Sequence, residues 1–250
     1  MTTQVWMLNH YAKRFPMSGG TRHHALAAGL AHHGMATTIL SAEAVGEVTE
    51  PPGDGVTFVQ VPARPYQGNG LGRMLNMAGF AWRAHRLGRH PERHGLAKPD
   101  VVLGSTPHPF AALAAWGIAK RHRVPFIFEV RDLWPESMVA ILGMKRWHPV
   151  VIVLGFLEKF LYAHADRIVG LLEGIGDHAA MRVGRKAGPV TWVPNGVDMS
   201  LLPDVTPATE PGEEFVVVYA GSHGPPNSLD TVLDAAEILD ARCENLKLDG

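Results

Sequence analysis

The residues best suited to chemistry follow a short apolar run in the middle of the chain. Residues 126–130, FIFEV, are rich in aromatic and β-branched side chains, the pattern of a buried strand. The run ends in RDLWPES at 131–137, where Arg131 can bind a carboxylate or phosphate and Asp132 can accept a proton or bind a sugar hydroxyl. Open α/β sheets bind ligands outside the carboxyl ends of their strands. The alternative is local: Arg131 and Asp132 pair with each other, and Trp134 fills a gap beneath the loop.

Three further segments place polar residues just after an expected strand. Gly19 and Gly20 lead from the first strand into a helix, where free N–H groups and the helix dipole favour a phosphate; a plain tight turn is the alternative. His108 follows the fourth strand and can donate a hydrogen bond or proton, unless it is only an exposed histidine in a helix-capping loop. Asn195 and Asp198 follow the last strand. Four polar loops at one edge of a parallel sheet predict a cleft.

The pattern of apolar residues and turns predicts the scaffold that positions these loops. Strands are expected over 4–8, 35–40, 56–61, 99–104, 126–130, 166–171 and 190–193, with helices over 21–33, 73–89, 108–122, 149–164 and 173–183. Strands separated by helical stretches of about ten to fifteen residues predict βαβ units and an α/β, doubly wound, mostly parallel sheet. We expect a Rossmann-like domain over 1–202, a linker rich in Pro, Glu and Thr over 203–213, and over 214–250 the opening βα unit of a second, incomplete domain.

Composition limits the class of protein. With 23 Lys and Arg against 24 Asp and Glu, the formal net charge is −1, so no excess positive charge favours nucleic acid. Cys243 is the single cysteine, which excludes an internal disulfide and a cysteine-based metal site and fits a reducing, cytoplasmic setting. His23 and His24 point to different sides of a helix without a carboxylate at ligand spacing, so we expect no metal. The N-terminus lacks the pattern of a signal peptide, and no run reaches the roughly 18 apolar residues of a spanning helix.

Several motifs resemble the N-terminal half of family-4 glycosyltransferases of GT-B fold, in particular the WbuB-like branch of bacterial surface-polysaccharide transferases. Residues 6–11, WMLNHY, with 19–23, GGTRH, resemble the opening of that branch, with Ser18 in place of a glycine. RDLWPES at 131–137 resembles its most distinctive run, and PNGVD at 194–198 resembles the family motif before the interdomain linker.

The resemblance implies a retaining enzyme that transfers a hexosyl- or N-acetylhexosaminyl-type sugar from a nucleotide diphosphate, chiefly UDP. The implied acceptor is a lipid-diphosphate-linked saccharide in surface polysaccharide (lipopolysaccharide) biosynthesis, and no metal or other cofactor is implied. The acceptor would bind the N-terminal domain and the nucleotide the C-terminal one. By the resemblance, Asp132 and His108 contact the acceptor hydroxyl or the transferred sugar, Asp132 in a positioning or proton-accepting role. The substrate-binding residues that it implies are Gly19, Gly20, Arg22, His23, Arg131, Glu136 and Asn195.

The resemblance also indicates what the chain lacks. Residues 219–224 resemble the glycine-bearing loop that opens the second domain, but the two-carboxylate E-x7-E donor motif of such enzymes belongs beyond Gly250. Without that part, the cleft between the domains cannot close and exclude water. We therefore expect this chain alone to have little or no transferase activity.

Residues 73–89 mix apolar side chains with Arg73, Arg83, Arg86 and Arg89. This pattern suits peripheral contact with an anionic membrane at the inner face of the cell membrane, while the alternative is an ordinary amphipathic helix with a solvated basic face. Two rival functions stay open: a sugar-nucleotide 2-epimerase of the same architecture, which needs no acceptor, and a non-catalytic binding domain. The absence of a G-x-G-x-x-G motif after the first strand argues against nicotinamide-dependent oxidoreduction.

Overall fold

Seven parallel strands form one sheet in the computed structural model, which describes residues 2–15, 17, 19–42, 55–68, 70–196, 217–221, 223–224 and 227–240. The strands are β1 (Thr3–Leu8), β2 (Met35–Ala42), β3 (Val56–Val61), β4 (Val101–Thr106), β5 (Phe126–Val130), β6 (Arg167–Gly170) and β7 (Val190–Trp192). Their order across the sheet is β3-β2-β1-β4-β5-β6-β7, and each neighbouring pair is parallel. The predicted α/β, doubly wound sheet is confirmed.

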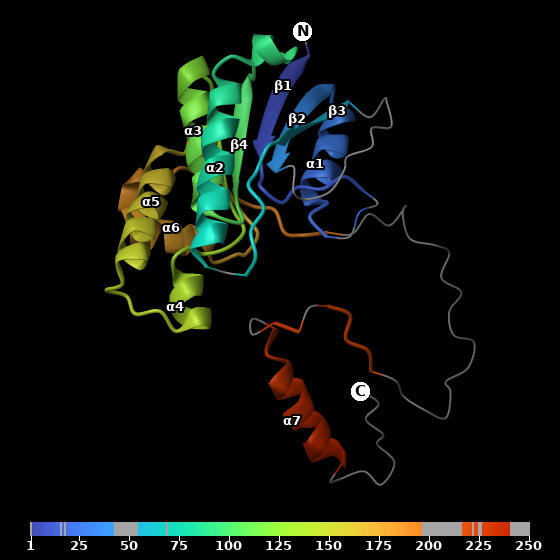
Figure 1. Cartoon of the computed structure of the whole chain (residues 1–250), viewed down its shortest axis with the longest axis vertical. Coiled ribbons are helices and arrows are strands. Elements are labelled where there is room, and N and C mark those ends of the chain that lie inside the picture. The colour runs from blue at the N-terminus through green and yellow to red at the C-terminus, as the bar shows by residue number, and fades with distance from the viewer. Residues whose placement is uncertain are drawn as a thin grey trace, which may run out of the picture.

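Helices cover both faces of this sheet (Figure 1). The described helices are α1 (Arg22–Ala31), α2 (Leu71–Gly88), α3 (Pro109–His122), α4 (Glu136–Leu142), α5 (Pro149–His164), α6 (Ile175–Val183) and α7 (Leu229–Asp240), with short 3-10 turns η2 (Pro91–His94) and η3 (Gly184–Lys186). α1 packs on one face of the sheet, and α2, α3 and α5 pack on the other. Among the described residues, no helix is long and apolar enough to cross a membrane.

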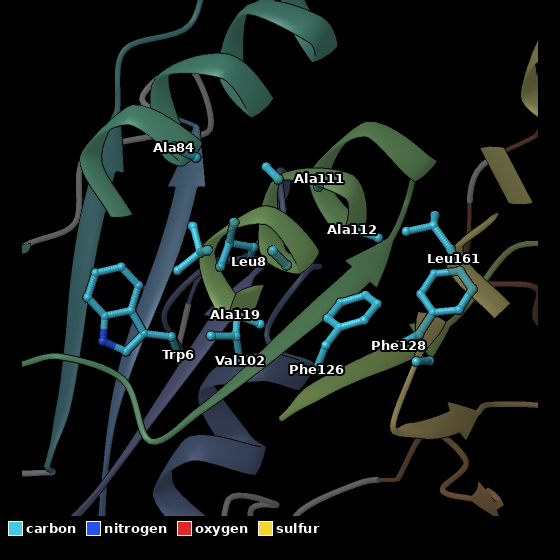
Figure 2. Close-up of a cluster of buried hydrophobic side chains, with 14 of the residues drawn as sticks. Trp6, Leu8, Ala84, Val102, Ala111, Ala112, Ala119, Phe126, Phe128 and Leu161 are labelled. Atoms are coloured by element: carbon cyan, nitrogen blue, oxygen red, sulfur yellow. The ribbon is translucent and has the colours of Figure 1, made fainter. Parts of the chain in front are cut away.

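The two faces of the sheet bury different side chains, as the alternation along a strand requires. Trp6 and Leu8 of β1 belong to the larger core under α2, α3 and α5, which also contains Val102, Phe126 and Phe128 (Figure 2). Val5, Met7, Ile39 and Leu103 point to the other face and pack with Ala27 of α1.

The Ala-rich sequence of α3 allows that helix to lie close to the sheet. A Cβ atom at Gly104 of β4 would stand only 2.7 Å from the Cβ atom of Ala115 and 2.8 Å from the Cα atom of Ala112. A larger residue at position 104 would therefore push α3 away from the strand whose carboxyl end it follows.

The sequence missed one helix and misplaced the ends of some strands. α4, over Glu136–Leu142, grows directly out of the RDLWPES run, where only a loop was expected. β4 continues through Ser105 and Thr106, which were expected to lie beyond the strand. The proposed linker over 203–213 lies outside the described residues. In the described part of the βα unit expected over 214–250, residues 217–220 belong to no strand, whereas α7 supplies the expected helix.

The order of the strands creates a crevice between β1 and β4. From β1 the chain moves to β2 and β3 on one side, and then returns to β4 on the other side of β1. The loops that leave the carboxyl ends of β1 and β4 therefore run in opposite directions, which opens a space between them.

Candidate functional site at the switch point

A cavity of about 510 Å³ lies at this switch point. It is lined by His10, Tyr11, Lys13, Gly19, Gly20, Tyr66, Asn76, Pro107, Arg131 and Asp132. These residues come from the loops after β1, β4 and β5, from the segment between β3 and α2, and from α2 itself. The expected convergence of Gly19, Gly20, Arg131 and Asp132 is thus found, on loops that follow parallel strands.

Hydrogen bonds hold the segment after β1 in place. The buried Asn9 donates from Nδ2 to Ser105 Oγ at 3.0 Å, and its Oδ1 accepts from the Tyr11 amide at 2.8 Å. These bonds join the ends of β1 and β4 and fix the backbone that carries the cavity residues His10 and Tyr11.

The glycine loop folds back onto the same segment. Gly19 and Gly20 have φ angles of +68° and +72°, which side chains other than glycine rarely adopt. The Gly20 carbonyl accepts from the Lys13 amide at 3.0 Å, and a Cβ atom at Gly20 would clash with the Tyr11 carbonyl oxygen. The loop is therefore a tight turn, as the alternative interpretation expected. The turn also exposes its backbone to the cavity.

His10 and His108 form a neutral pair of rings. Their centroids lie 4.9 Å apart in an edge-on arrangement, and Phe80 lies 4.6 Å from the His10 ring. Burial and the nearby Arg73 lower the pKa of His10 to about 4, although Asn76 offsets part of this shift. Burial, His10 and Arg73 lower the pKa of His108 well below its usual range.

The two rings lie at different depths, since His10 lines the cavity and His108 does not. His108 Nδ1 accepts from the Ala111 amide at 3.4 Å and so caps α3, but His108 is fully buried, not exposed as the capping alternative expected. Pro107 rather than His108 forms the cavity wall there. Within the described residues, both nitrogens of His10 and Nε2 of His108 have no hydrogen-bond partner. A neutral imidazole can donate through one nitrogen and accept through the other.

Arg131 and Asp132 both face the cavity instead of each other. Thr106 Oγ1 accepts from the Arg131 amide at 2.9 Å and fixes the start of the loop. In the described part of the chain no ion pair joins the two side chains, so the purely local pairing is wrong. Partial burial raises the pKa of Asp132, and Arg131 opposes that rise. A carboxylate with a raised pKa is a better proton acceptor than an ordinary aspartate.

Arg22, His23 and Asn195 meet in a different place, around the buried Glu129 of β5. Arg22 Nε lies 3.0 Å from Glu129 Oε1, and His23 Nε2 lies 2.7 Å from Glu129 Oε2. Burial by itself would raise the pKa of Glu129, but hydrogen bonds from His23 and Ser105 and the charge of Arg22 lower it to about 2. The carboxylate is therefore ionised, and its two cationic or donor partners stabilise it.

Arg22 also binds the chain after β7. Its guanidinium donates to the carbonyl oxygens of Val193 and Pro194, at 2.8 Å each, and to Asn195 Oδ1 at 3.4 Å. Arg22, His23 and Asn195 do not line the cavity. Their ligand-binding role stays a prediction, whereas the contacts of Arg22 tie Pro194 and Asn195 to Glu129 of the sheet. Asp198 lies outside the described residues.

Glu136 lies apart from the other predicted residues. It forms a bidentate ion pair with Arg146, at 3.0 and 2.8 Å, and lines a separate cavity of about 200 Å³ between α4 and α5. The neighbouring Arg146 lowers the pKa of Glu136. Its predicted contact with substrate has no support from its position.

Several cavity residues escaped the sequence reasoning. His10 and Tyr11 directly follow β1, so the rule that favoured loops after strands should have selected them. Tyr66 lies in the segment between β3 and α2, and Asn76 lies in α2. Neither residue belongs to a polar motif at the end of a strand. The Tyr11 and Tyr66 hydroxyls lie 3.2 Å apart across the cavity, a contact that the sequence cannot show.

The cavity offers few side chains that could bind a metal among the residues that the structure describes. The cavity offers one carboxylate, Asp132, and the residues that the structure describes contain no group of three or more His, Cys, Asp or Glu side chains that could hold an ion. The adjacent histidines have other roles: His23 contacts Glu129, and His24 Nδ1 accepts from the Phe15 amide at 3.2 Å.

Solved structures share the fold at low sequence identity. Sucrose-phosphate synthase from Thermosynechococcus elongatus is 12% identical with a TM-score of 0.59, over 81% of this chain and 50% of the other. A UDP-glucose: anthocyanidin 3-O-glucosyltransferase in complex with UDP is 9% identical with a TM-score of 0.55, over 83% of this chain and 56% of the other. LpCGTa in complex with UDP is 15% identical with a TM-score of 0.52, over 87% of this chain and 61% of the other.

The chain thus spans about half to three fifths of the length of these structures. No curated protein matches it by sequence. Residues 19–196 match the sequence profile of the family described as "Glycosyl transferase 4-like domain", which is more than half of the 250 residues and includes the glycine loop, RDLWPES and the end of β7. The chain therefore belongs to the glycosyl transferase 4-like domain family.

Proposed function

We propose that this domain binds the acceptor for a retaining glycosyltransferase, which moves a hexosyl- or N-acetylhexosaminyl-type sugar from UDP to a lipid-diphosphate-linked saccharide. The observation that carries the proposal is the cavity at the switch point, because it combines donors and acceptors for hydroxyls with groups that attract phosphate. The nucleotide would bind a second domain that faces this edge, and two of the structures that share the fold were solved in complex with UDP.

One part of the cavity suits the hydroxyls of a saccharide. The neutral His10 ring, Asn76 and the paired hydroxyls of Tyr11 and Tyr66 supply both donors and acceptors. A sugar presents many hydroxyls that each need a partner when buried, and mixed donor-acceptor groups meet that need. The Tyr rings add apolar surface for the sugar's C–H groups.

The opposite part suits an anion. Lys13 and Arg131 both line the cavity, and the Gly19–Gly20 turn brings backbone close to it. Among the described residues that line the cavity, Lys13 and Arg131 are cationic and Asp132 is the one carboxylate, and this lining favours a phosphate or diphosphate group on the acceptor. This charge balance is the support for a diphosphate-linked acceptor over a neutral glycan.

Asp132 is the residue we assign to the acceptor hydroxyl. It is the one carboxylate among the cavity residues within the described part of the chain, and its raised pKa makes it a suitable hydrogen-bond and proton acceptor. As that hydroxyl attacks the sugar, its proton passes to Asp132 or to the departing phosphate, and the role of Asp132 is to orient the attacking oxygen.

The test is Asp132→Asn in an enzyme that carries a complete donor domain. We expect turnover to fall about 10²-fold or more, with unchanged circular dichroism, because the neutral amide holds the attacking hydroxyl less strongly than a carboxylate and cannot accept its proton. Asp177→Asn, an exposed position on α6, is the matched control and should keep its turnover. Wild-type turnover in Asp132→Asn removes that residue from the reaction.

Two further measurements separate the rivals. Product analysis with UDP-sugar alone detects a 2-epimerase, because an epimerase needs no acceptor. Titration of this chain with a soluble prenyl-diphosphate saccharide tests the cavity directly: Arg131→Gln should weaken binding about tenfold or more, by loss of a charged hydrogen bond. Equal affinity of both proteins contradicts the anionic acceptor, and binding without turnover in the complete enzyme supports a non-catalytic binding domain.

We place the reaction at the cytoplasmic face of the cell membrane, where a nucleotide-sugar donor and a lipid-linked acceptor meet.

A further inference from the structure

α5 is apolar on two opposite faces. Val151 and Leu154 are buried against the rest of the domain, at 5% and 1% exposure. Ile152, Val153 and Phe156 lie on the other side of the helix and are 45%, 62% and 69% exposed. A surface helix of a water-soluble domain usually has polar residues on its outer face, so an apolar outer face needs a partner.

The exposed apolar residues continue beyond α5. Ile141 and Leu142 at the end of α4 are 43% and 63% exposed, and Trp147 in the following loop is 70% exposed. We call the six residues Ile141, Leu142, Trp147, Ile152, Val153 and Phe156 the α4–α5 surface. A Trp at the edge of such a surface is typical of the boundary between lipid and water.

Positive charge surrounds the α4–α5 surface. Lys145 lies 5.5 Å from the Trp147 ring centre, and Lys159 lies one helical turn from Phe156. The nearby carboxylates are already neutralised: Glu136 pairs with Arg146, and the buried Glu158 contacts Arg182 and His178 at 2.7 Å each. Among the residues that the structure describes, neither lysine has a carboxylate partner. The surface therefore combines apolar contact area with unneutralised ammonium groups.

We propose that the α4–α5 surface docks the protein onto a bilayer that contains anionic lipid. Apolar side chains would enter the acyl boundary while Lys145 and Lys159 contact the headgroups. α5 has 16 residues, about 24 Å of helix, which is shorter than the roughly 30 Å hydrocarbon core, so the helix lies in the interface and does not span it.

The surface adjoins the acceptor cavity along the chain. Asp132 lines the cavity, and α4 begins at Glu136, so the RDLWPES run leads directly from one to the other. In Figure 1, α4 and the start of α5 lie beyond the lower end of the sheet, the end to which the β1 strand points. A docked domain would thus hold the cavity near the headgroups, where the diphosphate of a lipid-linked acceptor is found. This inference rests on the proposed function only for the biological purpose of docking, because binding to a bilayer itself requires no sugar.

A second copy of the chain is the less suitable occupant. A symmetric dimer through this surface would bring Lys145 and Lys159 of both copies together, and like charges oppose such contact. α2 is the rival membrane surface that the sequence predicted. Its exposed large apolar residues are only Leu75 and Trp82 within the described residues, and Arg86 already lies 4.9 Å from the Trp82 ring centre.

The test is flotation of the full 250-residue chain with vesicles of phosphatidylcholine alone or with phosphatidylglycerol. We expect binding to the anionic vesicles and little to the neutral ones. Val153→Ser with Phe156→Ser should lower the partition coefficient about tenfold or more, by loss of inserted apolar area. Lys145→Gln with Lys159→Gln should lower it about 30-fold at low salt, since each lysine near an anionic surface contributes about 1 kcal/mol.

Leu75→Ser with Trp82→Ser is the matched control, because it removes equally exposed apolar residues from α2. We expect this variant to bind vesicles as the wild type does. No flotation of the wild type, or the larger loss in the α2 variant, overturns the proposal. Concentration-dependent dimers in sedimentation that Phe156→Ser abolishes, without flotation, would assign the surface to a second copy instead. Flotation is independent of turnover, so it can fail while the proposed transferase activity stands, and the reverse.

Discussion

His10→Gln should remove a loss of stability that the protein otherwise suffers on mild acidification. Burial and Arg73 lower the pKa of His10 from 6.5 to about 4 in the folded protein. The unfolded chain binds this proton with the ordinary pKa, so it binds more protons than the folded state between about pH 6.5 and 4, and stability falls as pH falls. The two pKa values correspond to about 2 kcal/mol lost between pH 7.5 and pH 5. Gln retains a donor and an acceptor but does not titrate.

Urea unfolding followed by tryptophan fluorescence at both pH values measures the effect. The loss of unfolding free energy from pH 7.5 to pH 5 should be about 2 kcal/mol smaller in His10→Gln than in the wild type, because other titrating groups contribute equally to both. His33→Gln, at an exposed position after α1, is the control and should keep the wild-type dependence. Equal pH dependence in wild type and His10→Gln would mean that His10 is solvated, and the argument for a neutral ring in the cavity would fail.

Two other substitutions test the parts that hold the site in place. Glu129→Ala leaves the buried guanidinium and imidazole around it without a carboxylate, and urea titration should show a loss of about 3 to 5 kcal/mol in unfolding free energy; a loss below 1 kcal/mol would contradict a structural role. Gly20→Ala should lower unfolding free energy and cavity-ligand affinity more than Gly19→Ala, because both residues have positive φ but only a Cβ at Gly20 meets the Tyr11 carbonyl. Gly19→Ala should cost only the backbone term, about 1 kcal/mol, and equal effects would show that the loop moves freely.

The fold followed from the sequence because the central parallel strands are largely buried. Runs such as 126–128 and 101–103 are continuous apolar segments, and their order with intervening helices permits few topologies. α4 was missed for a physical reason: seven residues that begin after Pro135 are too few to show a periodicity, and none of them is buried. Hydrogen bonds and the Glu136–Arg146 ion pair hold this helix in place, and it has no buried apolar face.

The site followed from the sequence only in part. The rule that ligands bind beyond strand ends located the correct edge, and it brought Gly20, Arg131 and Asp132 to one cavity. The rule did not predict which residues at that edge line the cavity and which lie behind its wall. His108 is at the right edge but lies behind the cavity wall, because the residue needed to cap α3 turns inward. Tyr66 reaches the cavity from a segment with no regular structure, which no periodicity describes.

One feature of the sequence distinguishes the role of Arg22 from that of Arg131, although both lie in segments that were predicted to bind a ligand. Glu129 stands inside the apolar run 126–130, and a carboxylate inside a buried strand needs a cation or several donors, since burial without them costs several kcal/mol. The strand supplies none, so the partner must come from another loop at the same edge. Arg22 and His23 meet that need, and only then does Arg131 remain to face a ligand. A charged residue within an apolar strand thus predicts that its partner has a structural role, before any substrate is considered.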